Sequence, residues 1–169
     1  MPSSLTQQVV YLAGPMSGLK FEDAQAWRSE ATESLHKLKD PRTKKPLYHV
    51  LNPLRGHADF RGKMFTPTGG FDDDSAAKVD IRRDRYDVLR CDIVYANLLG
   101  ATKTGKVSIG TVFELVWGVE SDKFILVIME GKQNPHWHSF VRDAASIMVP
   151  TQADALEYMA TILNVSEVG

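Results

Sequence analysis

Short runs of apolar residues alternate along the chain with longer stretches in which apolar residues recur every three or four positions. The short runs predict five buried strands, over residues 9–13, 47–51, 92–98, 124–129 and 147–149. The longer stretches predict helices over residues 22–38, 75–90, 111–121, 138–145 and 151–163. Wholly apolar strands that alternate with amphipathic helices indicate an α/β fold, in which helices cover both faces of a parallel sheet.

Ligands of such a sheet bind beside the carboxyl ends of the strands, so the loops that follow the strands are where function is expected. The first of these loops, Gly14-Pro15-Met16-Ser17-Gly18, precedes a helix whose N-terminus favours an anion. The loop fits neither GxGxxG nor the Walker pattern. Two interpretations stay open: a ligand-binding loop, or a tight turn between strand and helix.

Composition fits one folded domain over residues 1–169, with a long loop insertion at about 54–74 that is either functional or disordered. A net charge of −1 argues against a polymeric nucleic acid as partner. Cys91 is the one cysteine, so no intrachain disulfide forms and a cytoplasmic location is expected. The chain lacks an apolar run of membrane-spanning length and the pattern of a signal peptide, so we expect no membrane association.

Glu114 stands out because it lies among apolar residues near the start of a helix, in Ile109-Gly110-Thr111-Val112-Phe113-Glu114-Leu115. Burial raises the pKa of a carboxyl group and a helix N-terminus lowers it. A carboxylate held there can attack a sugar carbon, as in retaining glycoside chemistry. The alternative is a glutamate that only complements the helix dipole.

Three further carboxylates, Asp80, Asp84 and Asp87, share one face of the helix predicted over 75–90. For Asp80 and Asp87 we favour a solvated face that is paired with neighbouring arginines. His136 and His138 form an HxH pair without a third ligand at a familiar spacing, so no metal is expected. Cys91 fits a small buried residue better than a nucleophile, and no GxSxG elbow is present.

Three ordered segments together resemble the nucleoside 2-deoxyribosyltransferase family and its nucleoside 5′-monophosphate N-hydrolases. The segments are Val10–Pro15, Asp84 followed by Asp92–Leu98, and Gly110–Leu115. The resemblance implies a flavodoxin-like three-layer sandwich with a five-stranded parallel sheet. It also implies an enzyme that cleaves the N-glycosidic bond of a 2′-deoxynucleoside or its 5′-monophosphate, without a cofactor.

The resemblance assigns roles to individual residues. Glu114 matches the nucleophile that forms a glycosyl-enzyme, Asp84 the acid that serves the departing base, and Tyr11 the tyrosine that positions the nucleophile. Asp92 matches a position that the fold explains better than chemistry does. The residues expected to bind substrate are Gly14, Pro15, Met16, Gly18, Asn97, Ser108, Gly110 and Ser139. Members of the family are homodimers or larger assemblies whose subunits share the active site, and their partner is a small-molecule substrate.

Two serines favour hydrolysis of a monophosphate over base transfer. Transferases of this family usually carry Asp where this chain has Ser108, and a late Asn where it has the stretch around Ser139. A serine hydroxyl can donate to a phosphate that an aspartate would repel. Arg142, His136 and His138 could add positive charge there. The alternative for both serines is a polar loop residue or a helix cap.

Three questions stay open after the resemblance is included: the reaction, the class of protein and the role of the insertion. The first is deoxyribosyl transfer between nucleobases. The second, from another class of protein, is a non-catalytic module that binds or senses a nucleotide. The third concerns the insertion at 54–74: it is either a surface loop or a lid in which Phe60, Phe65 or Phe71 stacks on the base.

Overall fold

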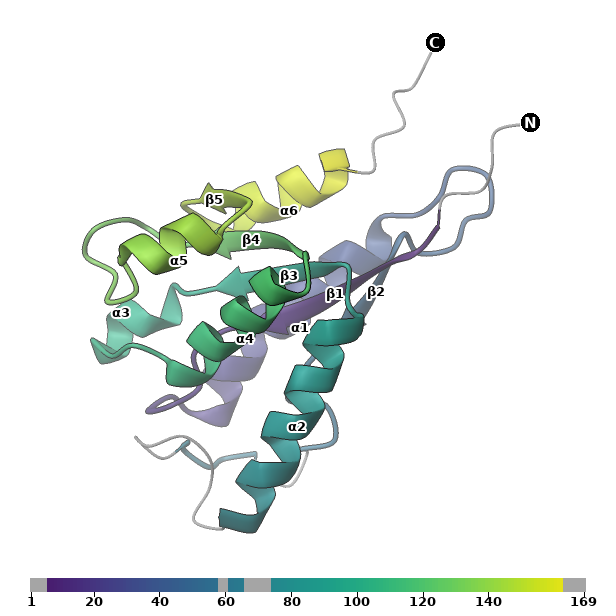
Figure 1. Cartoon of the computed structure of the whole chain (residues 1–169). Helices are drawn as coiled ribbons and strands as arrows, with labels where there is room; N and C mark the ends of the chain where they lie inside the picture. The colour runs from purple at the N-terminus through teal and green to yellow at the C-terminus, as the bar shows by residue number, and fades with distance from the viewer. Residues whose placement is uncertain (1–5, 58–60, 66–73, 163–169) are drawn as a thin grey trace.

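The computed structural model describes residues 6–57, 61–65 and 74–162, and only the backbone of residues 74–80 (Figure 1). Within these residues the strands are β1 (Gln8–Ala13), β2 (Tyr48–Leu51), β3 (Ile93–Asn97), β4 (Phe124–Ile128) and β5 (Ile147–Val149). The helices are α1 (Phe21–Lys37), α2 (Asp74–Arg90), α3 (Gly100–Thr104), α4 (Ile109–Glu120), α5 (Ser139–Ala144) and α6 (Gln152–Ile162).

The strands form one parallel sheet in the order β2-β1-β3-β4-β5. β1 therefore lies between β2 and β3, and Tyr11 pairs with Leu51 on one side and with Val94 on the other. Ala13 pairs with Ala96, so β1 and β3 end side by side. The five-stranded parallel sheet and the flavodoxin-like α/β fold are both confirmed.

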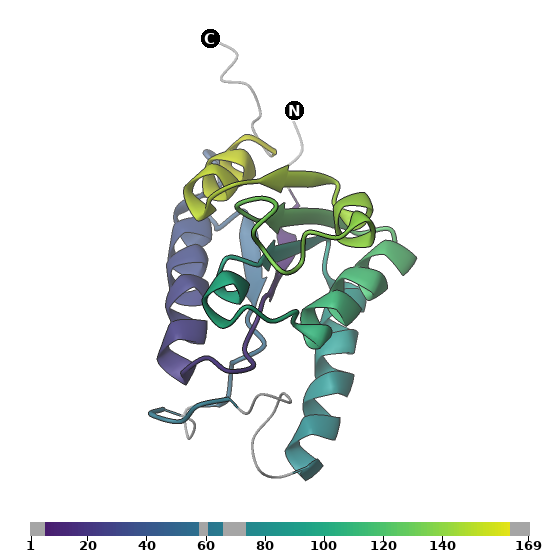
Figure 2. The ribbon, with the colours of Figure 1, turned by 90° about the vertical axis from the view of Figure 1, so that its left-hand side faces the viewer.

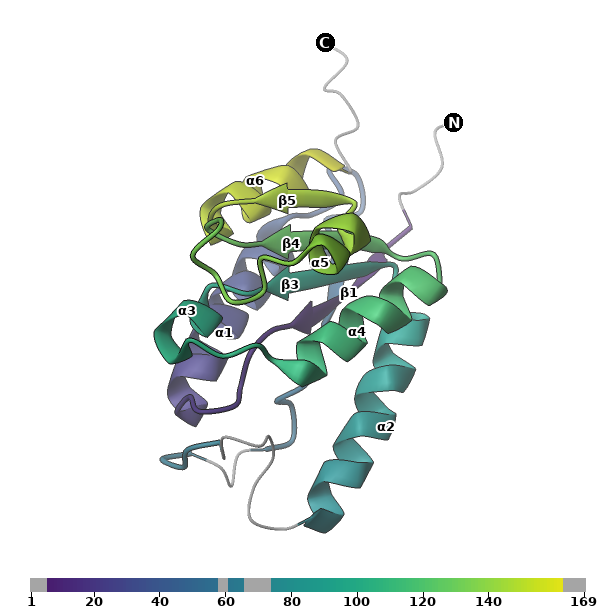
Figure 3. The ribbon, with the colours of Figure 1, turned by 60° about the vertical axis from the view of Figure 1, so that its left-hand side comes forward.

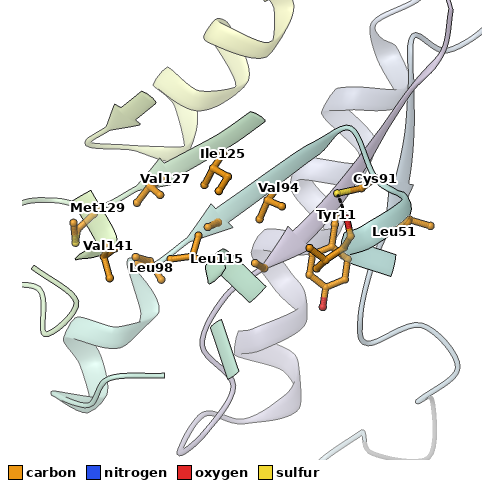
Figure 4. Packing of buried hydrophobic residues seen from close by; sticks show 13 residues of the cluster. Tyr11, Leu51, Cys91, Val94, Leu98, Leu115, Ile125, Val127, Met129 and Val141 are labelled. Atoms are coloured by element: carbon orange, nitrogen blue, oxygen red, sulfur yellow. Dashed lines mark hydrogen bonds between the residues drawn. The ribbon is translucent and has the colours of Figure 1, made fainter. Parts of the chain in front are cut away.

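Helices cover both faces of the sheet, as Figure 2 shows with the sheet between two helical layers. α1 and α6 pack on the face that carries Val10, Leu12 and Tyr95. α2, α4 and α5 cover the other face (Figure 3), which carries Tyr11 and Val94. In Figure 4 the ring of Tyr11 lies in this second core, near Val94 and Cys91. The candidate nucleophile Glu114 therefore belongs to the layer on this face of the sheet, between the strands and the helices α2, α4 and α5.

Two elements differ from expectation for local reasons. α4 starts at Ile109 instead of Thr111, because Ser108 is the N-cap and its side chain accepts a hydrogen bond from the Thr111 N–H. Residues 100–104, between the predicted strand 92–98 and the predicted helix 111–121, form the short helix α3, whose C-cap Gly105 has a φ of 63°. Glycine adopts that left-handed conformation without the steric cost that other residues meet.

Phe65 is the candidate lid residue that the structure describes, and it is buried in a small cluster with Phe21, Ala24 and Leu54. Its ring stacks on that of Phe21 with centroids 6.4 Å apart. Phe65 thus anchors its loop to the start of α1 and does not present its ring to a ligand. The other two candidates, Phe60 and Phe71, lie outside the described residues.

Candidate active site

Glu114 and Tyr11 form a buried pair between α4 and β1. The Tyr11 hydroxyl donates a hydrogen bond of 2.6 Å to Oε1 of Glu114. Tyr11 is 0% exposed and Glu114 is 6% exposed. The second carboxyl oxygen of Glu114, Oε2, has no hydrogen-bond partner among the described residues. Because buried polar atoms are nearly always paired, this unpaired carboxyl oxygen is a candidate contact for an atom of a ligand.

Packing of α4 against the sheet brings this pair together. Gly118, one helical turn after Glu114, lies so close to the sheet that an added Cβ would be 3.1 Å from Ile125 and 3.2 Å from Val94. Leu115 is also buried, so the face of α4 that carries Glu114 is an apolar one. The close approach at Gly118 holds the glutamate against Tyr11 of β1.

Electrostatics favour the neutral form of Glu114 in the protein without ligand. Burial, opposed by the hydrogen bond from Tyr11, raises the pKa of Glu114 to about 8. The negative charge of Asp84 adds to this increase, and the positive charge of Arg28 opposes it. The same neighbourhood raises the pKa of Tyr11 well above its ordinary value, mainly through burial. A carboxyl group with a pKa near neutral is typical of a functional site.

Asp84 is the third group of the site, and it comes from α2. It is 9% exposed, and its charge acts on both Glu114 and Tyr11. The Arg83 guanidinium lies 3.4 Å from one of its carboxyl oxygens. The three residues predicted to be catalytic therefore lie within electrostatic reach of one another, although they come from three separate elements.

An ionic cluster holds α2 in place. Asp87 is fully buried and bonded to two arginines: Arg55 on one carboxyl oxygen, and Arg90 on the other at 2.9 Å. Arg83 also donates to the carbonyl of Pro53, which ties the loop after β2 to the same helix. The expectation of a solvent-exposed Asp87 is wrong, because Arg55, from a distant loop, covers it. The side chain of Asp80 lies outside the described residues.

Arg28 of α1 is a member of the site that sequence reasoning missed. It is 0% exposed and donates to the carbonyl oxygens of Ala24 at 2.5 Å and Gly14 at 2.9 Å. Its guanidinium lies over the Trp27 ring, 4.3 Å from the centroid. One signal was available: Arg28 follows Ala24 and precedes Ala31 on the buried stripe of α1, where a cation is unusual.

The glycine-rich loop packs tightly at its start. A Cβ at Gly14 would lie 2.7 Å from both the carbonyl oxygen of Asn97 and the Trp27 ring, so only glycine fits there. Pro15 is buried and Met16 packs partly against the Phe21–Phe65 cluster. Gly18 has a φ of 78° and donates its N–H to the carbonyl of Phe65. The loop is thus a rigid turn at the carboxyl end of β1, next to Arg28.

The remaining predicted substrate ligands are either committed within the fold or exposed. The Asn97 side chain donates to Gln152 at 2.7 Å and accepts from the Leu99 N–H. The Ser108 hydroxyl lies 2.9 Å from that of Thr111, in agreement with the helix-cap interpretation. Gly110 and Ser139 are exposed, near the starts of α4 and α5. No described side-chain hydrogen bond joins any of these four residues to the Glu114 carboxyl group.

His136 corrects another expectation, that it adds positive charge. Its Nε2 accepts a 2.8 Å hydrogen bond from the Ser108 N–H, so this nitrogen carries no proton. Burial also lowers the pKa of His136. The residue is therefore a neutral link between the 130–138 loop and α4. By contrast, Asp92 has the role in the fold that was expected, since its carboxylate accepts the Val9 N–H at 2.8 Å.

Together these residues define an α/β protein whose flavodoxin-like sheet carries a buried carboxyl–tyrosine pair, a second carboxylate and a buried arginine. Among the described residues no three His, Cys, Asp or Glu side chains gather in a way that could hold a metal ion. No helix in that part of the chain is long and apolar enough to cross a bilayer.

Two solved structures are similar to this chain over most of its length. One is a 2-deoxyribosyltransferase from Bacillus psychrosaccharolyticus, with a TM-score of 0.58 and 17% identity, covering 89% of this chain and 91% of that one. The other is a CMP N-glycosidase from Clostridium botulinum, with a TM-score of 0.54 and 15% identity, covering 92% and 100%. No family model and no curated protein matches the chain in sequence. These likenesses confirm the fold that the resemblance implied.

Proposed function

We propose that this protein cleaves the N-glycosidic bond of a 2′-deoxynucleoside or its 5′-monophosphate, with Glu114 as nucleophile. The observation that carries the proposal is the Glu114 carboxyl group: Tyr11 holds one oxygen, and the other is buried and unpaired. The likeness in fold to a deoxyribosyltransferase and a CMP N-glycosidase supports the same reaction class.

The chemistry divides one difficult substitution into two easier ones. Ionised Glu114 attacks the anomeric carbon through Oε2, the C–N bond breaks, and its electron pair leaves with the base. Asp84 gives a proton to that base, which makes it a better leaving group. The transition state resembles an oxocarbenium ion, which a nearby carboxylate stabilises. Water then cleaves the glycosyl ester, with Asp84 taking a proton from the water.

We favour a 5′-monophosphate as substrate and water as acceptor, with base transfer as the alternative. Ser108 stands where transferases of the family that the chain resembles carry an Asp, which would repel a phosphate dianion, and Ser139 lies in the stretch where they carry an Asn. Ser139 is exposed on α5, and the exposed Arg142 follows three residues later on the same helix. Ser108 is committed to its helix cap, so Ser139 and Arg142 are the better candidates for phosphate.

We also propose that a second copy of the chain covers α4 and completes the site. The outer side of α4 exposes Ile109, Phe113, Val116 and Val119, by 66%, 53%, 45% and 50% respectively. The helix α5 lies beside α4 (Figure 3). Its Phe140, next to Ser139 in sequence, is 79% exposed. A contiguous apolar stripe of this kind is typical of a protein interface. Light scattering should give twice the chain mass for wild type and Met64→Asp, and the monomer mass for Phe113→Asp.

The test of the proposed reaction is chromatography of the free base released from deoxynucleosides and their 5′-monophosphates, with and without a second base. Glu114-dependent release from monophosphates without an acceptor would support hydrolysis. A new nucleoside formed only with an acceptor would support transfer and contradict the interpretation of the serines. Binding of nucleotides without any release would favour a sensing module instead.

A further inference from the structure

Arg28 is a buried cation that contacts no group of opposite charge among the described residues. No carboxylate of a described residue lies within ion-pair distance of its guanidinium. Two of its nitrogens donate to the carbonyls of Ala24 and Gly14, and Nε has no partner among the described residues. Burying an uncompensated charge is costly, so this arrangement needs negative charge nearby.

That negative charge comes from the candidate active site. Burial lowers the pKa of Arg28 to about 10, and the charges of Glu114, Tyr11 and Asp84, when these groups are ionised, oppose this effect. Because the pKa of Tyr11 is raised well above its ordinary value, the two carboxyl groups are the sources of negative charge near neutral pH. The three groups reach the site from α4, β1 and α2, whereas Arg28 reaches it from α1 on the other face of the sheet. Its contact with the Gly14 carbonyl places it at the end of β1, where the two faces meet.

We propose that Arg28 is a positioning residue of this site. Its guanidinium fixes the Gly14 carbonyl at the end of β1, and it supplies the positive charge that balances one negative charge exchanged between Glu114 and Asp84. The part of this proposal that concerns the transfer of negative charge between Glu114 and Asp84 rests on the proposed function.

The charges balance through the first chemical step. The protein without ligand favours neutral Glu114, so the reactive form is the one in which the proton has moved to Asp84. In that form Glu114 is ionised, Asp84 holds the proton and Arg28 is positive. Formation of the glycosyl ester removes the charge of Glu114, and protonation of the departing base transfers a negative charge to Asp84. Arg28 therefore faces one negative charge on either side of the step. In a buried site, a fixed countercharge stabilises such a transfer without reorganisation of solvent.

The direct test is a carbon-13 NMR titration of the Glu114 carboxyl group, with Glu114→Gln used to identify its resonance. In Arg28→Met the titration midpoint should rise by about one pH unit or more, because a compensating charge is lost. Arg28→Lys keeps a charge and should shift it less. Arg82→Met removes an exposed arginine and should leave it in place. An unchanged or lower midpoint in a folded Arg28→Met would overturn the electrostatic part.

Amide hydrogen exchange tests the positional part. Residues 16–19 should exchange faster in Arg28→Met than in wild type, while Arg82→Met should match wild type. Equal exchange in all three would overturn this part. If Arg28→Met does not fold, we expect Arg28→Gln to show the same rise in the Glu114 titration midpoint and the same faster amide exchange at residues 16–19. It removes the charge, and its shorter amide does not restore the two-pronged contact with Ala24 and Gly14.

These readouts separate the inference from the proposed function. A shifted Glu114 titration without base release by wild type would leave the Arg28 inference standing and remove the reaction. Glu114-dependent base release, together with a Glu114 titration midpoint that is unchanged in Arg28→Met, would support the reaction and overturn the electrostatic part of the Arg28 inference. If both hold, the acidic limb of the kcat/KM profile should move to higher pH in Arg28→Met by the same amount as the NMR midpoint.

Discussion

Two buried carboxyl groups of this protein, those of Asp87 and Glu114, differ in how their oxygens are hydrogen-bonded. Asp87 is enclosed by Arg55 and Arg90, which bond to both of its oxygens. Glu114 receives one hydrogen bond from a neutral hydroxyl, and its other oxygen is unpaired among the described residues. The first carboxylate is satisfied by the fold, whereas the second is left with capacity for a ligand. The difference separates a structural charge from a candidate catalytic one.

The largest expected effect tests the catalytic side of this comparison. Glu114→Gln should lower the rate of base release by about 10³-fold or more, because a neutral amide is a poor nucleophile. The measurement is the initial rate of base formation under saturating substrate. Glu120→Gln, an exposed glutamate on the same helix, is the matched control and should retain the wild-type rate. Turnover by Glu114→Gln would contradict the assignment.

Stability should respond to pH through Glu114. Its pKa is about 8 in the folded protein against 4.5 ordinarily, so between these values the folded state binds a proton that the unfolded state releases. The free energy of unfolding of wild type therefore decreases as pH rises across this range. At pH 8 Glu114→Gln should be more stable than wild type by about 4 kcal/mol, against about 1 kcal/mol at pH 5. A difference in urea midpoint between wild type and Glu114→Gln that stays the same at all pH values would contradict this expectation.

The structural side is tested by Asp87→Asn. This substitution leaves Arg55 and Arg90 without their counterion, and should lower the free energy of unfolding by about 2 kcal/mol. The loss is smaller than for a fully buried pair because the arginine side chains are 38% and 45% exposed and can reach water. Urea denaturation at neutral pH measures it. Asp122→Asn in an exposed turn should change stability by less than about 0.5 kcal/mol.

The smallest expected effect compares two buried tyrosines. Tyr11→Phe removes the hydrogen bond to Glu114 and should reduce kcat/KM by about tenfold, with the acidic limb moved to higher pH. Tyr48→Phe removes a 2.6 Å bond to the Met159 carbonyl, far from Glu114 in the fold, and should change stability alone. Equal kinetic effects of the two variants would indicate that Tyr11 acts only through packing.

Hydrophobic patterning was sufficient for the fold because the inner strands β1, β3 and β4 are largely apolar and buried, whereas the edge strand β2 includes the exposed His49. The run 124–129, for example, corresponds to β4 with only its last residue in excess. Helix boundaries depend on capping residues, which hydrophobic patterning does not locate. Because Ser108 caps α4, this helix begins at Ile109 instead of the predicted Thr111. Residues 100–104 carry no amphipathic signal long enough to predict α3.

The site was predicted in part. Tyr11, Asp84 and Glu114 were identified from ordered motifs, and the structure brings Tyr11 and Glu114 into contact. Arg28 and the burial of Asp87 depend on contacts between elements distant in sequence: Arg28 with Gly14, and Asp87 with Arg55. No local pattern encodes such contacts. Asn97 was expected at the substrate, but its amide is bonded to Gln152 of α6.

The most direct test of the account is to trap the glycosyl-enzyme. A 2′-fluoro deoxynucleoside 5′-monophosphate slows both steps by destabilising the oxocarbenium-like transition states, so the intermediate should accumulate. Mass spectrometry of the quenched protein and its peptides should then show one sugar phosphate attached to Glu114, with no adduct on Glu114→Gln. Base release that leaves no adduct on Glu114, or an adduct on another residue, would contradict the central claim.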